Sequence, residues 1–287
     1  MKQLTVISGK GGTGKTSITA AFASLAKNTM FADCDVDAAD LHLIFKPNII
    51  EKKKFHGLKI ASVNKQKCTL CNKCYDYCRF NAIDKEINIK KESCEGCGVC
   101  NYICPVNAIK MIERDSGFSY ISNTRFGPFA HARLKTAEEA SGKLVTVVRN
   151  DAIKIAEEKN KDLIIIDGPP GIGCPVISSI TGVDLVLIVT EPSLSGIHDL
   201  KRITNVTFHF KIPAVVCINK YDVNVYNTKD IEKYCLYNKI PLVGKIPYDI
   251  SMSRSMVEEK TIFEYYNGIL CLEIKKMWEK IRSILEL

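Results

Sequence analysis

Near its start the chain reads LTVISGKGGTGKT, from Leu4 to Thr16. The apolar run from Leu4 to Ile7 ends at a glycine-rich loop, as a buried strand does before a turn. Beyond the loop, apolar residues recur with a helical period from Ile18 to Lys27. The pattern Gly-x4-Gly-Lys-Thr between a strand and a helix is a Walker A pattern, and it predicts a loop that binds phosphate.

The residue types in this loop suit a polyphosphate ligand. Glycines let successive backbone N–H groups curl around phosphate oxygens, and the following helix adds the positive end of its dipole. We expect Lys15 to contact the β- and γ-phosphates and Thr16 to bind Mg²⁺. The loop residues predicted to bind nucleotide are Gly9, Lys10, Gly11, Gly12, Thr13, Gly14, Lys15 and Thr16.

Acidic residues follow two further strand-like runs. The segment Met30–Ala32 leads into Asp33 and Asp35, and the apolar run Leu163–Ile166 leads into Asp167. Residues at alternate positions of an extended chain point the same way, so Asp33 and Asp35 are predicted to share one acidic pocket. A carboxylate at the position of Asp167 suits the shell of a magnesium ion that is bound to nucleotide.

Strands and helices alternate along the rest of the chain. Continuous apolar runs are typical of parallel strands that are covered on both faces. The sequence therefore predicts a three-layer α/β fold of the P-loop NTPase class with a mostly parallel sheet. Further strands are predicted at 58–63, 185–189, 214–218 and 242–246, and helices at 151–159, 195–209, 227–239 and 269–287. The lysines at 52–54 are predicted to lie in a solvated loop, and a second loop, rich in Gly, Ser, Asn and Pro, is predicted after the cysteine-rich segment.

Eight of the thirteen cysteines lie between Cys68 and Cys104. The run C-x2-C-x2-C-x3-C-x2-Asn-Ala-Ile starts at Cys68 and is repeated 26 residues later from Cys94. Such runs are the bacterial ferredoxin pattern, in which the fourth cysteine binds the other of two clusters. Zinc is the alternative, and this crossed spacing disfavours it. The predicted ligands of one [4Fe–4S] cluster are Cys68, Cys71, Cys74 and Cys104, and those of the other are Cys94, Cys97, Cys100 and Cys78.

The repeat interrupts the α/β pattern. We therefore predict a discontinuous ATPase domain formed by residues 1–63 and 115–287, with a ferredoxin-like insert at 64–114. In the first run Arg79 follows the fourth cysteine where proline is usual, whereas the second run keeps Pro105. This difference concerns the surroundings of one cluster and not the presence of either.

Composition and charge exclude several classes of protein. Of the 287 residues, 46% are apolar and 25% charged, as in ordinary globular proteins. No run of 18 apolar residues is present, so no membrane span is expected. A glycine comes too early for a signal peptide, so we expect a cytoplasmic protein. The formal charge of +8 falls to about +4 once eight thiolates and two cluster cores are counted, which is too little to favour nucleic acid.

Several of these motifs resemble those of the MinD/ParA/Mrp-type ATPases, a group that also includes the nitrogenase iron protein. A lysine at position 10, ahead of Lys15, marks their deviant Walker A motif. The segments Asp33-Cys-Asp, Asp167-Gly-Pro-Pro-Gly and Asn219-Lys follow in the expected order. Over essentially its whole length the chain is similar to MinD-superfamily ATPases that carry an inserted ferredoxin domain.

The resemblance implies roles for single residues. Lys10 corresponds to the signature lysine that reaches the nucleotide of the partner subunit in an ATP-sandwich dimer. Asp35 corresponds to the aspartate that orients the attacking water, and Asn219 to an asparagine that contacts the base. The candidate catalytic residues are therefore Lys10, Lys15 and Asp35, and the candidate magnesium residues are Thr16, Asp33 and Asp167.

One segment leaves the base open. Asn219-Lys-Tyr-Asp222 also fits the N-K-x-D pattern of GTPases. A carboxylate at Asp222 would accept from the N1 and N2 donors of guanine. The early lysine at position 10 favours ATP.

The motifs together imply ATP, Mg²⁺ and two [4Fe–4S] clusters as cofactors. They imply a homodimer, or a heterodimer with a paralogous ATPase, and a protein partner for electron transfer. Our main hypothesis is an ATP-gated electron-transfer protein. One alternative is an assembly factor for iron–sulfur or other metallocofactors, although the C-x-x-C motif of such carriers does not occur after Cys104. Another is a positioning ATPase of the MinD or ParA kind. Neither nucleic acid nor a membrane is expected as a partner.

Overall fold

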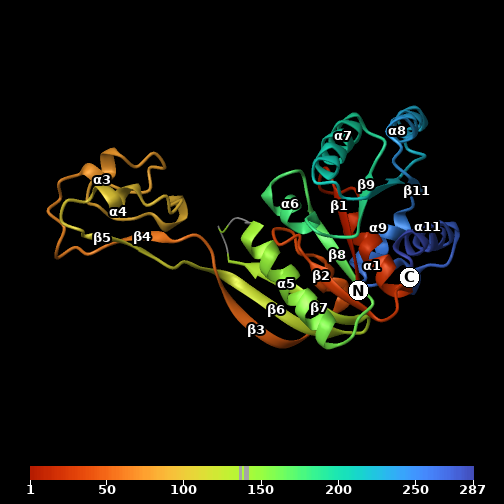
Figure 1. Cartoon of the computed structure of the whole chain (residues 1–287), viewed down its shortest axis with the longest axis horizontal. Helices are drawn as coiled ribbons and strands as arrows, with labels where there is room; N and C mark the ends of the chain where they lie inside the picture. The colour runs from red at the N-terminus through yellow and green to blue at the C-terminus, as the bar shows by residue number, and fades with distance from the viewer. Residues whose placement is uncertain (136–137, 139–141) are drawn as a thin grey trace. The chain divides into compact units, whose positions relative to one another are not determined.

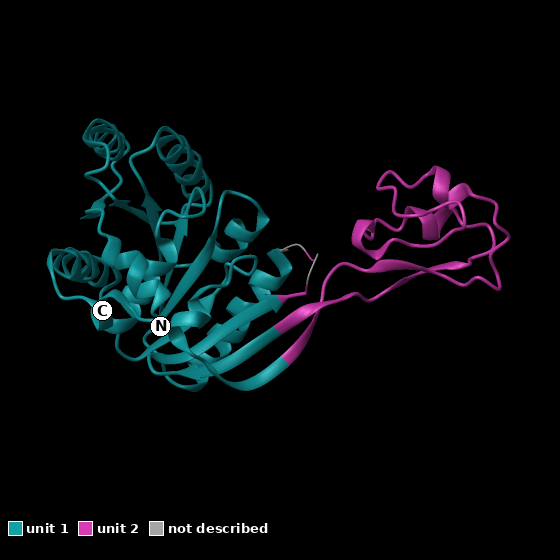
Figure 2. Ribbon diagram, turned by 180° about the vertical axis from the view of Figure 1, so that it is seen from behind, with its two compact units in different colours: residues 1–52, 119–133, 140–287 teal, residues 53–118, 134–139 magenta. Residues whose placement is uncertain are grey.

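A computed structural model describes residues 1–135, 138 and 142–287 of the chain. The chain divides into two compact units (Figures 1 and 2). Unit 1 contains residues 1–52, 119–133 and 140–287, and unit 2 contains residues 53–118 and 134–139. The whole of the predicted insert, 64–114, lies within unit 2.

A nine-stranded sheet forms the centre of the α/β fold. Its strand order is β11-β10-β9-β1-β8-β2-β7-β6-β3. Neighbouring strands from β11 to β7 pair in parallel, so the carboxyl ends of these strands share one edge. The strands are β1 (Lys2–Ser8), β2 (Thr29–Asp33), β3 (Asn48–His56), β6 (Asp115–Thr124), β7 (Gly127–Leu134), β8 (Leu163–Pro170), β9 (Leu185–Thr190), β10 (Ala214–Asn219) and β11 (Leu242–Ile246).

Helices cover both faces of this sheet, which confirms the three-layer α/β prediction. The helices α1 and α11 contact one face, and α5, α6 and α7 contact the other through β1, β2, β8 and β9. The helices of unit 1 are α1 (Lys15–Leu25), α2 (Leu41–Phe45), α5 (Gly142–Glu158), α6 (Cys174–Ile180), α7 (Leu194–His209), α8 (Val225–Tyr237), α9 (Ile250–Val257), α10 (Ile262–Tyr265) and α11 (Ile269–Leu285).

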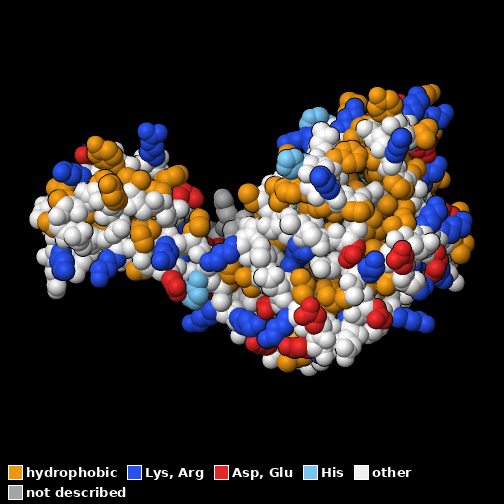
Figure 3. All heavy atoms as spheres, in the orientation of Figure 1, with side chains coloured by type: hydrophobic (Ala, Val, Ile, Leu, Met, Phe, Trp, Pro, Cys, Tyr) orange, Lys and Arg blue, Asp and Glu red, His pale blue; other side chains and the backbone are white. Residues whose placement is uncertain are grey.

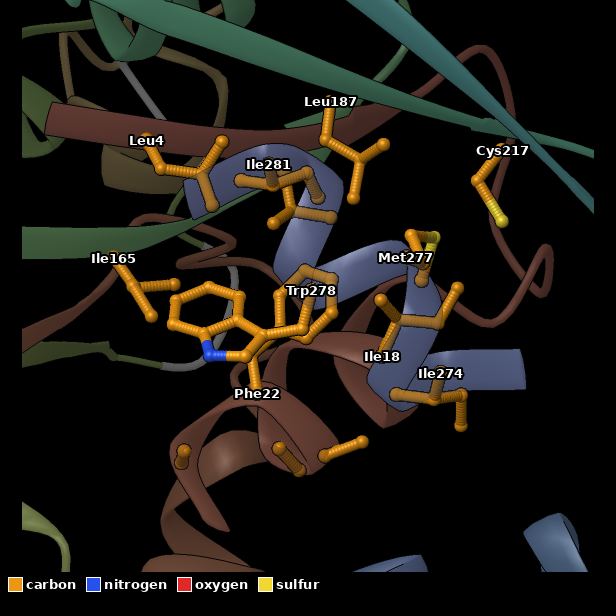
Figure 4. Packing of buried hydrophobic residues seen from close by; sticks show 14 of the residues in the cluster. Leu4, Ile18, Phe22, Ile165, Leu187, Cys217, Ile274, Met277, Trp278 and Ile281 are labelled. Atoms are coloured by element: carbon orange, nitrogen blue, oxygen red, sulfur yellow. The ribbon is translucent and has the colours of Figure 1, made fainter. Parts of the chain in front are cut away.

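The core between the sheet and α1 and α11 is apolar and closely packed (Figure 4). Alternate strand residues such as Leu4 and Leu187 point into it, because successive side chains of a strand face opposite sides. The rings of Phe22 and Trp278 lie 4.9 Å apart between the two helices. The helix predicted at the end of the chain is confirmed as α11, and its apolar face packs on unit 1.

Of three predictions about the middle of the chain, the first is confirmed in part and the other two are wrong. The predicted strand at 58–63 does not join the main sheet; its residues Ile60–Val63 form β4, which pairs with β5 (Ile109–Ile112) in a separate antiparallel sheet. The lysines at 52–54 lie in β3 rather than in a loop, because an edge strand tolerates exposed charged side chains. The predicted second loop contains β6 and β7, which are joined by only two residues.

Unit 2 shows the sequence repeat in its backbone. It contains α3 (Lys73–Asp76), a 3-10 turn η1 (Lys91–Ser93) and α4 (Val99–Ile103). Positions 26 residues apart adopt the same left-handed conformation, with φ of 59° at Asn72 and 78° at Gly98, and 51° at Asn81 and 50° at Asn107. The two halves of the repeat therefore fold alike.

Among the described residues, no helix combines the length and apolar character needed to cross a membrane.

Candidate nucleotide site and cysteine site

The phosphate loop lies at the carboxyl edge of the sheet, between β1 and α1. Two of its glycines, Gly12 and Gly14, have positive φ values of 78° and 93°. A side chain at Gly14 would also collide with Asn219. The Asn219 amide donates to the carbonyl of Thr13 over 2.8 Å, so β10 supports the loop from the side. Glycine is favoured at both positions because of the positive φ, and at Gly14 also because Asn219 approaches closely.

A cavity of about 310 Å³ opens above this loop. Residues from six separate stretches of the chain form it. The lining residues are Ser8, Gly11, Gly12, Thr13, Gly14, Lys15, Thr16, Ser17, Asp35, Ala38, Asp40, Pro170, Asn219, Lys220, Ile246, Pro247, Tyr248, Asp249, Met252, Ser253 and Leu270. Sequence reasoning had predicted the loop and Asn219, but it missed the segment from Ile246 to Asp249, which carries no phosphate-binding pattern.

Two of the predicted catalytic residues, Lys15 and Asp35, meet the predicted magnesium residues beside the loop, whereas Lys10 lies elsewhere. The ammonium group of Lys15 lies 3.0 Å from Oδ2 of Asp35 and 3.2 Å from Oδ1 of Asp167. The hydroxyl of Thr16 donates to the other oxygen of Asp167 over 2.7 Å. Burial opposes the charge of Lys15, but the attraction of Asp167 and Asp35 outweighs it and raises the pKa of the lysine. Burial disfavours the charged carboxylate of Asp35 more than the attraction of Lys15 favours it, so the pKa of Asp35 is raised.

The fifth member of this group, Asp33, has an unsatisfied oxygen. Its Oδ1 accepts the backbone N–H of Asp35 over 3.1 Å. Its Oδ2 is buried and has no hydrogen-bond partner among the described residues. Burial, followed by repulsion from Asp167, raises the pKa of Asp33 well above its ordinary value. A buried carboxylate oxygen without a partner, beside a second carboxylate and the Thr16 hydroxyl, fits the oxygen ligands that Mg²⁺ prefers.

The early lysine, Lys10, is held by the turn after β9. Its ammonium group lies 2.6 Å from Oε1 of Glu191. It also donates to the hydroxyls of Ser193 over 3.2 Å and Ser195 over 2.9 Å. The other carboxylate oxygen of Glu191 lies 3.2 Å from the ammonium group of Lys220. Sequence reasoning missed Glu191; its place directly after a buried strand was the only available signal.

The two residues predicted to contact the base lie in different surroundings. Asn219 lines the cavity, whereas Asp222 is not among the described residues that form the lining. The carboxylate of Asp222 accepts the backbone N–H of Tyr248 over 2.7 Å. It thereby holds Tyr248, which belongs to the segment of the cavity lining from Ile246 to Asp249.

Four of the predicted cluster cysteines line one hollow in unit 2. They are Cys78, Cys94, Cys97 and Cys100. Burial raises the pKa of the Cys100 thiol to about 11, and the nearby thiols of Cys94 and Cys97 contribute to the shift. The fourth cysteine of the first run thus lies with the first three of the second run, as crossed ligation requires.

The other four predicted cluster cysteines are Cys68, Cys71, Cys74 and Cys104, and three of them, Cys68, Cys74 and Cys104, pack in one apolar cluster of unit 2. Burial raises the pKa of the Cys74 thiol, and the neighbouring thiols of Cys68 and Cys71 add to the effect. The sulfur of Cys104 accepts the backbone N–H of Ala108 over 3.2 Å. In the described part of the chain, no group of three Cys, His, Asp or Glu side chains is placed to hold a single metal ion.

Charged side chains are widely distributed on the surface. On the face seen in Figure 3, Lys and Arg lie at many separate places on both units, with Asp and Glu also present on each. The buried charges described above belong to the loop region of unit 1 and not to this outer surface.

A family model and known proteins match nearly the whole chain. The model of the CobQ/CobB/MinD/ParA nucleotide binding domain matches residues 4–262. The uncharacterized protein MJ0578 of Methanocaldococcus jannaschii is 34% identical over 288 residues, which cover 99% of this chain and 97% of that protein. A second uncharacterized protein of the same organism, MJ0579, is 27% identical over 275 residues, which cover 92% of this chain and 93% of that protein.

The fold also matches a solved structure. The septum site-determining protein MinD of Pyrococcus horikoshii, solved in complex with Mg-ADP, superimposes with a TM-score of 0.60. The match covers 99% of this chain and 97% of that protein at 18% sequence identity. At this level of identity the likeness concerns the fold.

Proposed function

Because the chain belongs to the CobQ/CobB/MinD/ParA family of nucleotide-binding domains, we propose that it is an ATPase whose nucleotide state switches a dimer and thereby recruits a protein partner. The observation that carries this proposal is the position of Lys15, held between Asp35 and Asp167 directly beneath the phosphate loop. A polyphosphate with its cation replaces the lysine–carboxylate contacts by a lysine–phosphate and a carboxylate–cation contact.

Each residue of the site has a proposed task. Lys15 and the backbone N–H groups of the loop hold the phosphates. Thr16, Asp33 and Asp167 hold Mg²⁺, which when bound neutralises charge that develops on the phosphoryl oxygens. Asp35, which lines the same cavity, orients and deprotonates the attacking water. The raised pKa of Asp35 suits a group that accepts a proton during the reaction.

We propose ATP rather than GTP as the substrate. The carboxylate that would recognise guanine is that of Asp222, and it is engaged with the N–H of Tyr248. Asn219 remains to contact the base from within the cavity lining. A single amide can donate to or accept from either purine, so the missing carboxylate weighs against guanine.

The proposed dimer rests on Lys10, whose counterpart in the resembling ATPases reaches the partner's nucleotide. The partner is a second copy or a paralogue, and the existence of two similar relatives in one organism supports the second possibility. The fold is shared with a MinD protein of Aquifex aeolicus that was solved in complex with MinC, which supports partner recruitment as the output of the switch.

The dimer is tested by replacing Lys10 with alanine. We expect wild-type protein to sediment as a dimer with Mg²⁺ and ATP and as a monomer with Mg²⁺ and ADP or with GTP. The Lys10→Ala variant should bind ATP with wild-type affinity but remain monomeric and hydrolyse ATP at least about tenfold more slowly, since a trans cation stabilises transferring phosphate. Unchanged turnover and sedimentation in the variant would exclude the trans role.

A second proposal concerns the cysteines of unit 2. We propose that they hold two [4Fe–4S] clusters, which supply one-electron transfer when bound. Support comes from the hollow lined by Cys78, Cys94, Cys97 and Cys100 and from the repeated backbone conformation around both runs. On this proposal the recruited partner is a redox protein, so that the nucleotide state gates electron transfer.

Metal analysis tests the cluster proposal. Protein isolated without oxygen should contain about eight iron and eight acid-labile sulfide per chain. The double variant Cys97→Ser/Cys100→Ser should contain about half, because it loses two ligands of one cluster only, and Cys235→Ser, a buried cysteine of unit 1, should keep all. Stoichiometric zinc without sulfide would contradict the proposal. ATP-dependent partner recruitment that survives cluster loss would assign the protein to the positioning class instead.

A further inference from the structure

The ammonium group of Lys10, whose side chain is 33% exposed, finds three acceptors in the turn after β9 and at the start of α7. A lysine ammonium has three N–H donors. In this structure the acceptors are Glu191 at 2.6 Å and Ser193 at 3.2 Å in the turn after β9, and Ser195 at 2.9 Å in the first turn of α7. The backbone of Lys10 is also fixed, because the Ser8 hydroxyl donates to its carbonyl over 2.8 Å. Lys10 is therefore directed toward its own chain.

The turn that holds Lys10 is itself compact. The Ser193 hydroxyl accepts the backbone N–H of Gly196 over 3.0 Å and so caps α7. The Thr190 hydroxyl donates to the carbonyl of Gly196 over 3.1 Å. A side chain at Gly196 would collide with the carbonyl of Glu191. These contacts fix the direction of the Glu191 carboxylate, because the backbone on both sides of it is held.

The same carboxylate also engages Lys220, a residue of the cavity lining. The Lys220 ammonium lies 3.2 Å from Glu191 and donates to the carbonyl of Gly12 in the phosphate loop over 3.2 Å. Attraction by both lysines lowers the pKa of Glu191, although partial burial acts in the opposite direction. One carboxylate thus joins the phosphate loop, the turn after β9 and the turn after β10.

We infer that Glu191 is a positioning residue that holds Lys10 in the monomer and must release it before the dimer can form. The inference rests on the proposed dimeric switch, in which Lys10 contacts nucleotide across the interface. Release exchanges a carboxylate for phosphate oxygens as the partner of the lysine. Glu191 therefore acts as a brake that sets how much ATP is needed for dimerisation.

The first test measures Lys10 in the monomer. An amine-specific acylating reagent, followed by mass spectrometry, reports how fast each lysine reacts. In Glu191→Gln, which keeps the side-chain size and removes the charge, we expect Lys10 to react several-fold faster than in the wild type. Lys276, which lies 2.7 Å from Glu273, is the internal reference and should not change. An unchanged rate at Lys10 overturns the inference.

The second test measures the ATP concentration for half-maximal dimerisation by light scattering. Glu191→Gln should lower this ATP concentration roughly five- to tenfold, because the monomer loses about one kcal/mol of stabilisation from the ion pair with Lys10. The matched control, Glu273→Gln, should leave it unchanged. An equal or higher ATP requirement in Glu191→Gln overturns the brake. The brake is also overturned if Glu191→Gln binds ATP more tightly than the wild type at protein concentrations where neither dimerises, because the variant then acts through a general effect of charge on ATP binding.

The two tests separate this inference from the proposed function. Faster reaction of Lys10 in Glu191→Gln, with no ATP-dependent dimer in either protein, overturns the dimeric switch, and the brake with it, but leaves the contact between Glu191 and Lys10 established. A dimer that forms normally in the wild type, with no change in either measurement for the variant, overturns the role of Glu191 and leaves the switch intact.

Discussion

Replacing Lys15 with methionine is expected to weaken ATP binding roughly 100-fold or more, which corresponds to about 2.7 kcal/mol. The side chain keeps its volume but loses the only ammonium group that lies between Asp35 and Asp167 in the described structure. Loss of a charged partner of phosphate usually weakens binding by this amount. Titration calorimetry with Mg²⁺ and ATP measures the effect.

The same variant should unfold more easily without nucleotide. Removing one member of a buried ion pair leaves the remaining carboxylates uncompensated and typically destabilises a protein by about 3–5 kcal/mol. Trp278 is the only tryptophan and is buried in the core of unit 1, so its fluorescence during urea unfolding reports on this unit. The control Lys233→Met, at an exposed pair with Asp230 on α8, should match the wild type. ATP affinity within threefold of the wild type would contradict the assignment.

Replacing Asp33 with asparagine is expected to stabilise the nucleotide-free protein by about 1–2 kcal/mol at pH 7.5. Burial and the repulsion of Asp167 raise the pKa of Asp33 in the folded state. A carboxyl group with a raised folded pKa favours folding in its neutral form, so its stabilising effect is lost as pH rises from the unfolded value through the folded one. Asparagine is neutral at every pH, so the variant does not lose folding stability as the pH rises.

The comparison with pH checks the cause. The advantage of Asp33→Asn in urea unfolding should be smaller at pH 5 than at pH 7.5, whereas the control Asp230→Asn, at an exposed pair, should show no such trend. Stabilisation by Mg²⁺ and ATP should fall in Asp33→Asn, because the variant lacks a carboxylate for the cation. A less stable Asp33→Asn protein at pH 7.5 would show that the charge of Asp33 is compensated in the folded state.

Much of the fold could be predicted because buried parallel strands need continuous apolar sequence. The run from Leu163 to Ile166 is such a case, since every residue in it is buried. The strand β3 gave no such signal. Its Ile49 and Ile50 are about half exposed and lysines follow them, because the strand lies at the edge of the sheet where one side meets solvent.

The site was predictable where a local pattern carries the chemistry. The phosphate loop is a run of eight residues, and its backbone conformation follows from its glycines. The contact between Lys10 and Glu191 joins residues 181 positions apart, so no local pattern contains it. The same holds for Asp222, because its hydrogen bond to Tyr248 depends on where β11 ends. Tertiary neighbours, and not spacing, decide these partners.

The way the chain enters and leaves the cysteine-rich segment bears on how such a protein can arise in evolution. The strands β3 and β6 are neighbours in one sheet, and the N–H of Gly57 donates to the carbonyl of Arg114 over 3.1 Å. The 56 residues between Gly57 and Arg114 therefore form a loop whose two ends are held together at the edge of the sheet. Because the entropy of closing a loop grows only slowly with its length, such a module can be gained, exchanged or lost by descent while the nucleotide site is left intact.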